Sequence, residues 1–328
     1  MDSDQLIFLS REEVKSLLEW DWLVEKIEQA FRSTSDGTGH QLSRISLRHK
    51  DGLFALMPGF VESKQNNETD NGQLLVLKTL NIFTRPGLPP LVATIFVFDI
   101  STTGHLKCVM DGEEITGWRT AAASAVVTKN IYKNVPSNKT DVLAVFGAGV
   151  QAKCHIECYQ HLFKFKEVRI WARNAKQGEK LVADLKTANV CGNIKYSSSK
   201  QECATNADVI ITTTTSPVPL VQYSWLKPNA HIVSIGVSPG SRVNELDLEI
   251  YRHAWLCVDS IATANSDLPI LKEANAVISG EVGDILTGKV SLPPSNKITI
   301  FHSLGMAVED VVTAETVYKK YVSKLQST

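Results

Sequence analysis

The spacing of apolar residues near the start of the chain predicts two amphipathic helices. Ser10 and Glu13 have the spacing of a capping box, in which each side chain satisfies a backbone N–H near the other, so the first helix is expected to begin after Ser10. In the second helix, apolar residues recur three and four positions apart, which places them on one face. These residues are Leu23, Ile27, Ala30 and Phe31. Gly37 and Gly39 end the second helix.

Four strand-like runs follow, separated by turn signals such as Asp51-Gly52. The runs cover residues 42–48, 53–57, 74–83 and 91–99. Strands in succession with little helix between them predict a mixed or antiparallel sheet. A long helix with only small residues at its middle is expected over 113–133.

From Asp141 the pattern alternates between short apolar runs and helical segments. The predicted strands are 142–146, 168–171, 209–213, 231–235, 255–258 and 298–302, and the helical segments are 150–163, 175–188 and 199–206. This alternation is typical of βαβ units and predicts a parallel, doubly wound sheet of the Rossmann type. A last helix, 306–325, has apolar positions that fit packing on the N-terminal part of the chain.

Together these elements predict an α/β protein that joins a Rossmann-type doubly wound parallel sheet to an N-terminal α+β domain. We expect the N-terminal domain at 1–118, joined by the C-terminal helix 306–328. An interdomain helix is expected at 119–134, and the Rossmann domain at 135–305.

The composition narrows the range of partners. The 328 residues are 43% hydrophobic, and 34 Lys and Arg against 35 Asp and Glu give a net charge of −1, so we expect neither a nucleic-acid nor a membrane partner. The first residues carry no basic segment before their apolar patch, unlike a secretory signal. The six cysteines form no C-x-x-C pair, and Cys154 and Cys158 lack further ligands at metal-binding spacing. This cysteine usage predicts a reduced, cytoplasmic protein without a metal site.

The stretch Gly147-Ala-Gly-Val-Gln-Ala152 has the spacing of a dinucleotide-binding turn. It follows a predicted strand and opens a predicted helix, which is the setting that this motif requires. Gly147 allows the tight turn, Gly149 lets the backbone approach a pyrophosphate, and Ala152 keeps helix and strand close. The alternative is an ordinary strand–helix turn that binds no ligand.

The end of the next predicted strand indicates which dinucleotide is bound. An NAD enzyme usually carries Asp or Glu here for the ribose 2′-hydroxyl, but this chain has Ala172, Arg173 and Asn174, and Glu167 precedes the strand. Arg173 can bind a 2′-phosphate by charge-assisted hydrogen bonds, so the sequence favours NADP(H). The alternative for Arg173 is a solvated surface residue.

Three basic residues in the N-terminal part occupy unusual settings. Lys78 interrupts an apolar run, where a lysine needs an anionic partner or a functional role unless it lies at a strand edge and reaches water. Arg44 lies in a predicted strand, and Arg119 precedes the small residues of the long helix. Each alone is typical of a surface or ion-pair residue. Together they predict a clamp for a carboxylate.

Several stretches of the chain resemble the ornithine cyclodeaminase/mu-crystallin family, and the resemblance covers almost the whole sequence. They are MDGEEITGWRTAAASAVVTK at 110–129, FGAGVQAKCH at 146–155, FKEVRIWARN at 165–174, ADVIITTTT at 207–215 and SLGMAVED at 303–310. The resemblance implies a homodimer whose N-terminal domain binds substrate and builds the dimer sheet. It also implies that the central Rossmann domain binds NADPH.

The resemblance assigns roles to individual residues. Arg44, Lys78 and Arg119 match positions around a substrate carboxylate. Asp267 matches an acidic position near the ligand pocket, although the sequence around it is typical of a helix-capping Asp. The positions expected to contact NADPH are Gly147, Ala148, Gly149, Val150, Gln151, Ala172, Arg173, Asn174, Thr212, Thr213, Thr214, Ser238 and Ser303.

Two departures from the family pattern bear on the chemistry. Cyclodeaminases carry a catalytic Asp after the strand that corresponds to 231–235, whereas this chain has Ser238, as the mu-crystallin branch does. A general base for deamination and ring closure is therefore missing. The family's Ser-His pair near the nicotinamide is replaced by Pro90 and Leu91, so those contacts are lost or made by the backbone.

The implied reaction is hydride transfer from NADPH to the C=N carbon of a small cyclic ketimine carboxylate. Arg44, Lys78 and Arg119 are the expected catalytic residues, because they would hold the carboxylate and orient the imine. Two alternatives follow from the mu-crystallin branch: NADPH-dependent binding of thyroid hormone and a structural crystallin role. A third is an alanine-type amino-acid dehydrogenase, against which the missing Asp at position 238 speaks.

Overall fold

The computed structural model describes residues 6–62, 73–83, 87–88, 91–133, 140–236 and 244–327. The chain divides into two compact units. Unit 1 comprises Met1–Arg119 and Gly305–Thr328, and unit 2 comprises Thr120–Leu304. The division falls within one long helix, α3 (Glu113–Tyr132), which closely matches the predicted helix.

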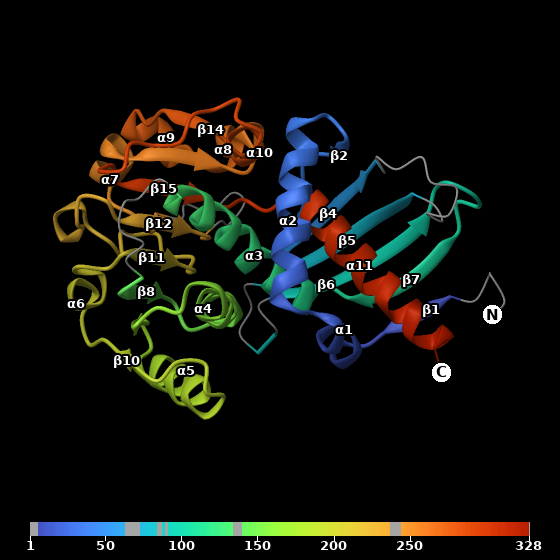
Figure 1. The fold of residues 1–328 in the computed structure, drawn as a ribbon, viewed down its shortest axis with the longest axis horizontal. Helices are drawn as coiled ribbons and strands as arrows, with labels where there is room; N and C mark the ends of the chain where they lie inside the picture. Colours follow the sequence, from blue (N-terminus) through green and yellow to red (C-terminus); the bar gives the residue numbers. More distant parts are fainter. Residues whose placement is uncertain are drawn as a thin grey trace. The chain divides into compact units, whose positions relative to one another are not determined.

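Unit 1 is built on a mixed sheet, as the succession of strands predicts (Figure 1). In the described residues the strand order is β1-β7-β6-β5-β4-β2, with β3 paired to β4. The pair β1–β7 is parallel and the other pairs are antiparallel. The strands are β1 (Ile7–Leu9), β2 (Gly39–Gln41), β3 (Ile45–His49), β4 (Gly52–Val61), β5 (Leu74–Phe83), β6 (Leu91–Asp99) and β7 (Leu106–Asp111).

Helices cover one face of this sheet. Successive side chains of a strand point to opposite faces, and buried residues therefore alternate with half-buried ones along β4, β5 and β6. The helices are α1 (Arg11–Leu17), α2 (Trp20–Ser35) and α11 (Ala307–Gln326), and α11 crosses β4 and β5 (Figure 1). The core between α11 and the sheet contains Val76, Ile95, Val97, Val311, Ala314 and Val317. The first helix begins with the predicted capping box, and the predicted apolar face of α2 is buried.

Unit 2 is built on a parallel sheet, which confirms the predicted doubly wound architecture. The strand order is β10-β9-β8-β11-β12-β15-β13-β14. The chain moves outward from β8 to β10 on one side and from β11 to β14 on the other, so the order reverses between β8 and β11. The last strand, β15, returns to lie between β12 and β13. The strands are β8 (Val142–Phe146), β9 (Glu167–Trp171), β10 (Ile194–Tyr196), β11 (Val209–Thr212), β12 (His231–Ser234), β13 (Trp255–Val258), β14 (Ile278–Glu281) and β15 (Thr299–His302).

The central strands of unit 2 are buried along their whole length, because helices connect parallel strands and cover the sheet. The core includes Ala144, Phe146, Ile210, Ile232 and Ile300. The connecting helices are α4 (Val150–Phe163), α5 (Ala175–Thr187), α6 (Lys200–Ala204), α7 (Leu248–His253), α8 (Ile261–Asp267), α9 (Pro269–Ala274), α10 (Val282–Leu286) and the 3-10 turn η1 (Tyr223–Trp225).

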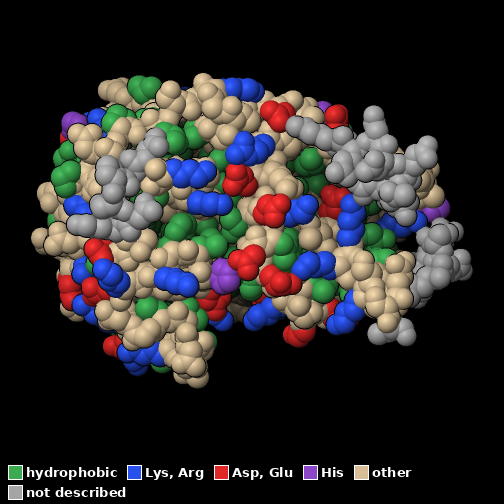
Figure 2. Space-filling model, in the orientation of Figure 1, with side chains coloured by type: hydrophobic (Ala, Val, Ile, Leu, Met, Phe, Trp, Pro, Cys, Tyr) green, Lys and Arg blue, Asp and Glu red, His purple; other side chains and the backbone are tan. Residues whose placement is uncertain are grey.

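Charges of both signs are interspersed on the surface drawn in Figure 2, in keeping with the net charge of −1. Within the described ranges, none of the helices combines the length and the apolar character needed to cross a bilayer. In the same ranges, no group of three or more His, Cys, Asp and Glu side chains is arranged to hold a metal ion.

Candidate functional site

The glycine turn of unit 2 lies between β8 and α4. Gly147 has a φ of +130°, which favours glycine, and a Cβ at this position would clash with the hydroxyl of Thr213. Gly149 precedes α4 as its N-cap, and nothing lies within 4 Å of the place where its Cβ would be. Gly149 has no side chain that could cap α4, which suits the approach of an anion to the start of the helix.

The residues after Gly149 continue this open surface. Val150 is 66% exposed, although it begins a helix that is otherwise well packed. The backbone carbonyl of Gln151 bonds to the ring Nδ1 of His155 at 2.7 Å, which ties down the first turn of α4. Ala148 lies half-buried between the two glycines. The structure therefore brings Gly147 to Gln151 together in a turn whose backbone a pyrophosphate can approach.

The end of β9 carries the residues predicted to select the dinucleotide. Ala172 is buried, Arg173 is exposed, and Asn174 caps α5 by accepting a hydrogen bond from the Gln177 N–H at 3.4 Å. Glu167 is the first residue of β9 instead of preceding it, and it pairs with Arg169 and Lys195.

Glu167 therefore lies at the opposite end of the strand from Arg173. Arg169 and Lys195 hold the pKa of the Glu167 carboxyl down at about 2. Within the described residues, the end of β9 carries no carboxylate that would repel a 2′-phosphate.

The three threonines at the carboxyl end of β11 all have hydroxyl groups that form hydrogen bonds. Thr213 Oγ1 donates to the Phe146 carbonyl at 3.2 Å, across the point where the strand order reverses. Thr212 and Thr214 donate to Glu245, a buried residue to which the sequence gave no role. These threonines shape the carboxyl edge of the sheet, and contact with a cofactor remains a prediction.

The other residues predicted to contact ligand in unit 2 lie at separate places. Ser303 follows β15 and is buried, and its N–H donates to the Ser234 carbonyl at 2.9 Å. Asp267 is the last residue of α8, and Leu268 is the N-cap of the next helix, so the expectation that Asp267 caps a helix is wrong. Ser238 lies outside the described residues. In unit 1, Pro90 also lies outside them, and Leu91 begins β6.

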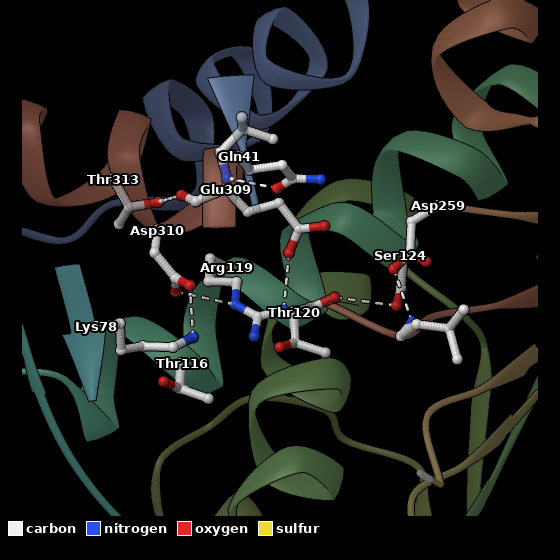
Figure 3. Close-up of polar contacts among 12 residues, drawn as sticks. Gln41, Lys78, Thr116, Arg119, Thr120, Ser124, Asp259, Glu309, Asp310 and Thr313 are labelled. Carbon is white, nitrogen blue, oxygen red and sulfur yellow. Dashed lines mark hydrogen bonds and ion pairs between the residues drawn. The ribbon is translucent and has the colours of Figure 1, made fainter. Parts of the chain in front are cut away.

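Two of the three predicted basic residues of unit 1, Lys78 and Arg119, lie beside two acids at the start of α11 (Figure 3). Lys78 Nζ lies 2.5 Å from Asp310 Oδ2, and Arg119 Nε lies 3.3 Å from Asp310 Oδ1. Arg119 Nη1 also donates to Glu309 Oε2 at 2.7 Å. We call Lys78, Arg119, Glu309 and Asp310 the charge cluster. Its four side chains are buried and their formal charges cancel.

Local structure explains why these charges meet. The alternation of β5 puts Lys78 on the same covered face as Val76 and Leu80. Glu309 and Asp310 lie in the first turn of α11, where the helix dipole favours acids. Gly305 precedes them with a φ of +80°, and a Cβ there would lie 3.0 Å from Arg119 Nη2. The SLGMAVED stretch therefore supplies both the acids and the space for Arg119.

Burial changes the protonation chemistry of Lys78. The pKa of its ammonium is lowered to about 8: loss of hydration is the main cause, Asp310 opposes the shift, and the nearby Arg119 charge adds to it. A lysine with this pKa exchanges its proton close to neutral pH, as a general acid must. The sequence left open whether Lys78 has an anionic partner, and that partner is Asp310.

Arg44 lies immediately before β3, so its expected position within a strand is wrong. It is half-buried. In the sheet, Ile45 pairs with Leu56 and Met57 pairs with Lys78. Arg44 directly precedes Ile45, at the end of β3 nearest the Met57–Lys78 pair.

Comparison with known proteins was made on the whole chain. The sequence profile of the ornithine cyclodeaminase/mu-crystallin family matches residues 4–325. A relative from Mus musculus named ketimine reductase mu-crystallin is 36% identical over 326 residues, which cover 96% of this chain and 97% of the relative.

Two solved structures share the fold over nearly their full length. The structure of Thermococcus litoralis Delta(1)-pyrroline-2-carboxylate reductase in complex with NADH and L-proline has a TM-score of 0.87 and 26% identity, and covers 97% of this chain and 98% of that chain. An archaeal alanine dehydrogenase dimer with bound NAD has a TM-score of 0.84 and 25% identity, and covers 97% of each chain.

Proposed function

Because the chain belongs to the ornithine cyclodeaminase/mu-crystallin family, we propose that it is a pyridine-nucleotide-dependent reductase of cyclic ketimine carboxylates. The observation that carries the proposal is the buried lysine of the charge cluster. Lys78 has a pKa of about 8 and lies beside a guanidinium, in a chain that matches a named ketimine reductase over almost its full length.

The ligands of the Thermococcus litoralis structure support the substrate class. L-Proline is what results when the C=N bond of pyrroline-2-carboxylate gains a hydride at carbon and a proton at nitrogen. The proposed substrate for this chain is likewise a ring that contains an imine next to a carboxylate.

Arg44 and the residues of the charge cluster have distinct roles in this proposal. Arg119 and Arg44 bind the substrate carboxylate, and Lys78 holds the proton that the imine nitrogen takes up. When bound, the reduced nicotinamide supplies the hydride. Glu309 and Asp310 hold the two cations in place before substrate arrives, which lowers the cost of ordering them.

NADP(H) is the cofactor that the dinucleotide site of unit 2 favours in our proposal. Arg173 is exposed at the end of β9, and the acid expected of an NAD enzyme is missing there. The two solved structures bind NADH and NAD, so the preference for NADP(H) rests on Arg173.

A homodimer is the second part of the proposal, and the uncovered face of the unit 1 sheet supports it. Large apolar residues alternate with the buried ones and remain half-exposed on this face. They form rows across neighbouring strands, such as Phe60, Leu75 and Phe98. An apolar surface of this extent is typical of a protein interface, and an archaeal relative is a dimer.

The test of the proposed function is the oxidation of NADPH, and separately of NADH, with a panel of possible substrates. The panel contains cyclic imine carboxylates of five- and six-membered rings, and pyruvate with ammonia. We expect turnover with the cyclic imines and a preference for NADPH. Turnover with pyruvate and ammonia alone would favour an amino-acid dehydrogenase, and no turnover with tight thyroid-hormone binding would favour a carrier.

A further inference from the structure

Glu245 is a buried carboxylate in unit 2 that accepts five hydrogen bonds through its side chain. Oε1 accepts from the N–H and the hydroxyl of Thr214, both at 2.6 Å. Oε2 accepts from Thr212 Oγ1 at 2.8 Å, from the Gly236 N–H at 3.0 Å and from Ser234 Oγ at 3.2 Å. Both oxygens therefore act as acceptors, which suits the ionised form.

The donors to Glu245 carry no charge, since all of them are hydroxyls or backbone amides. Burial raises the pKa of the Glu245 carboxyl, and the hydrogen bonds from Thr214, Thr212 and Gly236 oppose that rise. Gly236 also makes the approach possible, because a Cβ at this position would clash with Oε2 and with the Thr214 carbonyl. Four residues, Thr212, Thr214, Ser234 and Gly236, thus donate hydrogen bonds to this one carboxylate.

The location of these donors points to a role at the dinucleotide site. Thr212 and Thr214 lie at the carboxyl end of β11, and Ser234 and Gly236 lie at the carboxyl end of β12. In doubly wound sheets, ligands bind outside the carboxyl ends of the strands, where the strand order reverses. That reversal falls between β8 and β11, next to the threonines that Glu245 holds.

The two halves of such a sheet bind the two halves of a dinucleotide. The β8–β10 half carries the glycine turn and Arg173, which suit the pyrophosphate and the adenosine side. The strands held by Glu245 begin the other half. We propose, on the basis of the proposed reductase function, that Glu245 is a positioning residue that fixes the ends of β11 and β12 in the shape that receives the nicotinamide half.

The variant Glu245→Gln tests this role with little change in size. Its amide has one acceptor oxygen and one NH2 donor, whereas both carboxylate oxygens now accept from a backbone N–H. Hydroxyl groups can rotate to accept from the NH2, but a backbone N–H cannot. Either Thr214 or Gly236 therefore loses its acceptor in each orientation of the amide, and one strand end shifts.

Asp208→Asn is the matched control. Asp208 is a buried carboxylate that directly precedes β11, at the amino edge of the same sheet. It accepts from the backbone N–H groups of Asp141 at 3.0 Å and Val142 at 2.8 Å, and it pairs with Lys227. Loss of the Asp208 carboxylate is expected to lower the stability of the fold and to leave the carboxyl ends of β11 and β12 unchanged.

The experiment measures dissociation constants of wild type and both variants for NADPH and NADH, and for 2′,5′-ADP and 5′-AMP, which contain only the adenosine side. For Glu245→Gln we expect a roughly tenfold weaker binding of whichever dinucleotide the wild type binds, as loss of one buried hydrogen bond implies. Binding of the adenosine fragments is expected to stay unchanged, and Asp208→Asn is expected to bind all ligands as the wild type does.

Equal binding of the dinucleotide by wild type and Glu245→Gln would overturn the inference, and so would a parallel loss of dinucleotide and fragment. If Glu245→Gln does not fold, Ser234→Ala replaces it, because it removes one donor at 3.2 Å; a two- to threefold weaker dinucleotide binding is then expected, and no change overturns the inference. If the wild type binds neither dinucleotide, the proposed function is wrong as well. If the wild type binds a dinucleotide and the variant binds it equally well, only the role of Glu245 is wrong.

Discussion

Asp310 in unit 1 and Glu245 in unit 2 are both buried carboxylates, but their surroundings neutralise them in different ways. Asp310 faces the charged groups of Lys78 and Arg119. Glu245 faces hydroxyls and backbone amides at the ends of two strands. One carboxylate is balanced by opposite charge and the other by fixed dipoles.

The difference bears on what each region can do. Charged side chains on β5 and α3 can exchange one anionic partner for another, so the two cations of the charge cluster can turn from Glu309 and Asp310 to the carboxylate of a substrate. Two of the five donors to Glu245 are backbone N–H groups, which cannot turn to a ligand, and the other three are uncharged hydroxyls. We therefore expect the charge cluster to take part in the reaction, and Glu245 to fix the shape of the dinucleotide site.

The largest expected effect comes from a substitution of Lys78 that lowers turnover but leaves cofactor binding intact. Lys78→Met removes the proton donor of the proposed mechanism, so we expect turnover of a cyclic imine carboxylate to fall by about 1,000-fold, the scale of general acid catalysis. NADPH binding, followed by its fluorescence, is expected to survive, because its predicted contacts lie in unit 2. Wild-type turnover in this variant would show that the charge cluster has only a structural role.

A stability cycle tests whether Asp310 is truly balanced by charge. Asp310→Leu leaves Lys78 buried without its anion, and we expect a loss of about 3–5 kcal/mol in the free energy of unfolding in urea. The double variant Lys78→Met/Asp310→Leu replaces the pair by apolar groups and is expected to recover most of that loss. Additive losses in the cycle would contradict direct coupling of the two residues.

Arg173 of unit 2 differs from the cations of the charge cluster, since it is exposed and no carboxylate pairs with it among the described residues. Arg173→Ala is expected to raise the KM for NADPH by about 20-fold, the scale of a charge-assisted hydrogen bond, and to leave the KM for NADH nearly unchanged. Steady-state kinetics with both cofactors measure this. Equal changes for both would remove Arg173 from the phosphate site.

Local patterns in the sequence predicted much of the fold. The capping box at Ser10 and the bounds of β5 and β6 agree with the structure, because each depends on neighbouring residues. The strands β1 and β10 have only three residues each, too few for a pattern to show. Lys107 and Asp111 interrupt the apolar pattern of β7, which was also missed.

The partners of the candidate site were harder to predict, because they lie far apart in the sequence. The setting of Lys78 left open an anionic partner, a functional role or a strand edge that reaches water, and nothing in the local pattern pointed to Asp310. Glu309 and Asp310 lay within a stretch that carried the family resemblance, yet only the fold brings them to Arg119. Glu245 gave no signal, because its partners are backbone amides and hydroxyls.

The smallest expected effect is a pH dependence that belongs to the charge cluster alone. Because the pKa of Lys78 is about 8, its ammonium form is lost as the pH rises through 8, and kcat/KM is expected to fall about tenfold per pH unit above it. A loss of stability caused by Lys78 does not explain such a fall. The unfolded lysine has a pKa near 10.5 and binds more protons over this range, so the contribution of Lys78 to stability rises with pH.

The measurement compares pH profiles of kcat/KM and thermal midpoints between pH 7 and 9 for wild type and Lys78→Met. The variant is expected to lack the limb near pH 8, and any limb that it retains belongs to the substrate imine. Glu245→Gln keeps Lys78, so its profile should retain the wild-type limb even where its cofactor binding is weaker. If the fall of kcat/KM near pH 8 disappears in Glu245→Gln and persists in Lys78→Met, the two roles are reversed: the reaction would depend on Glu245, and Lys78 would have the structural role.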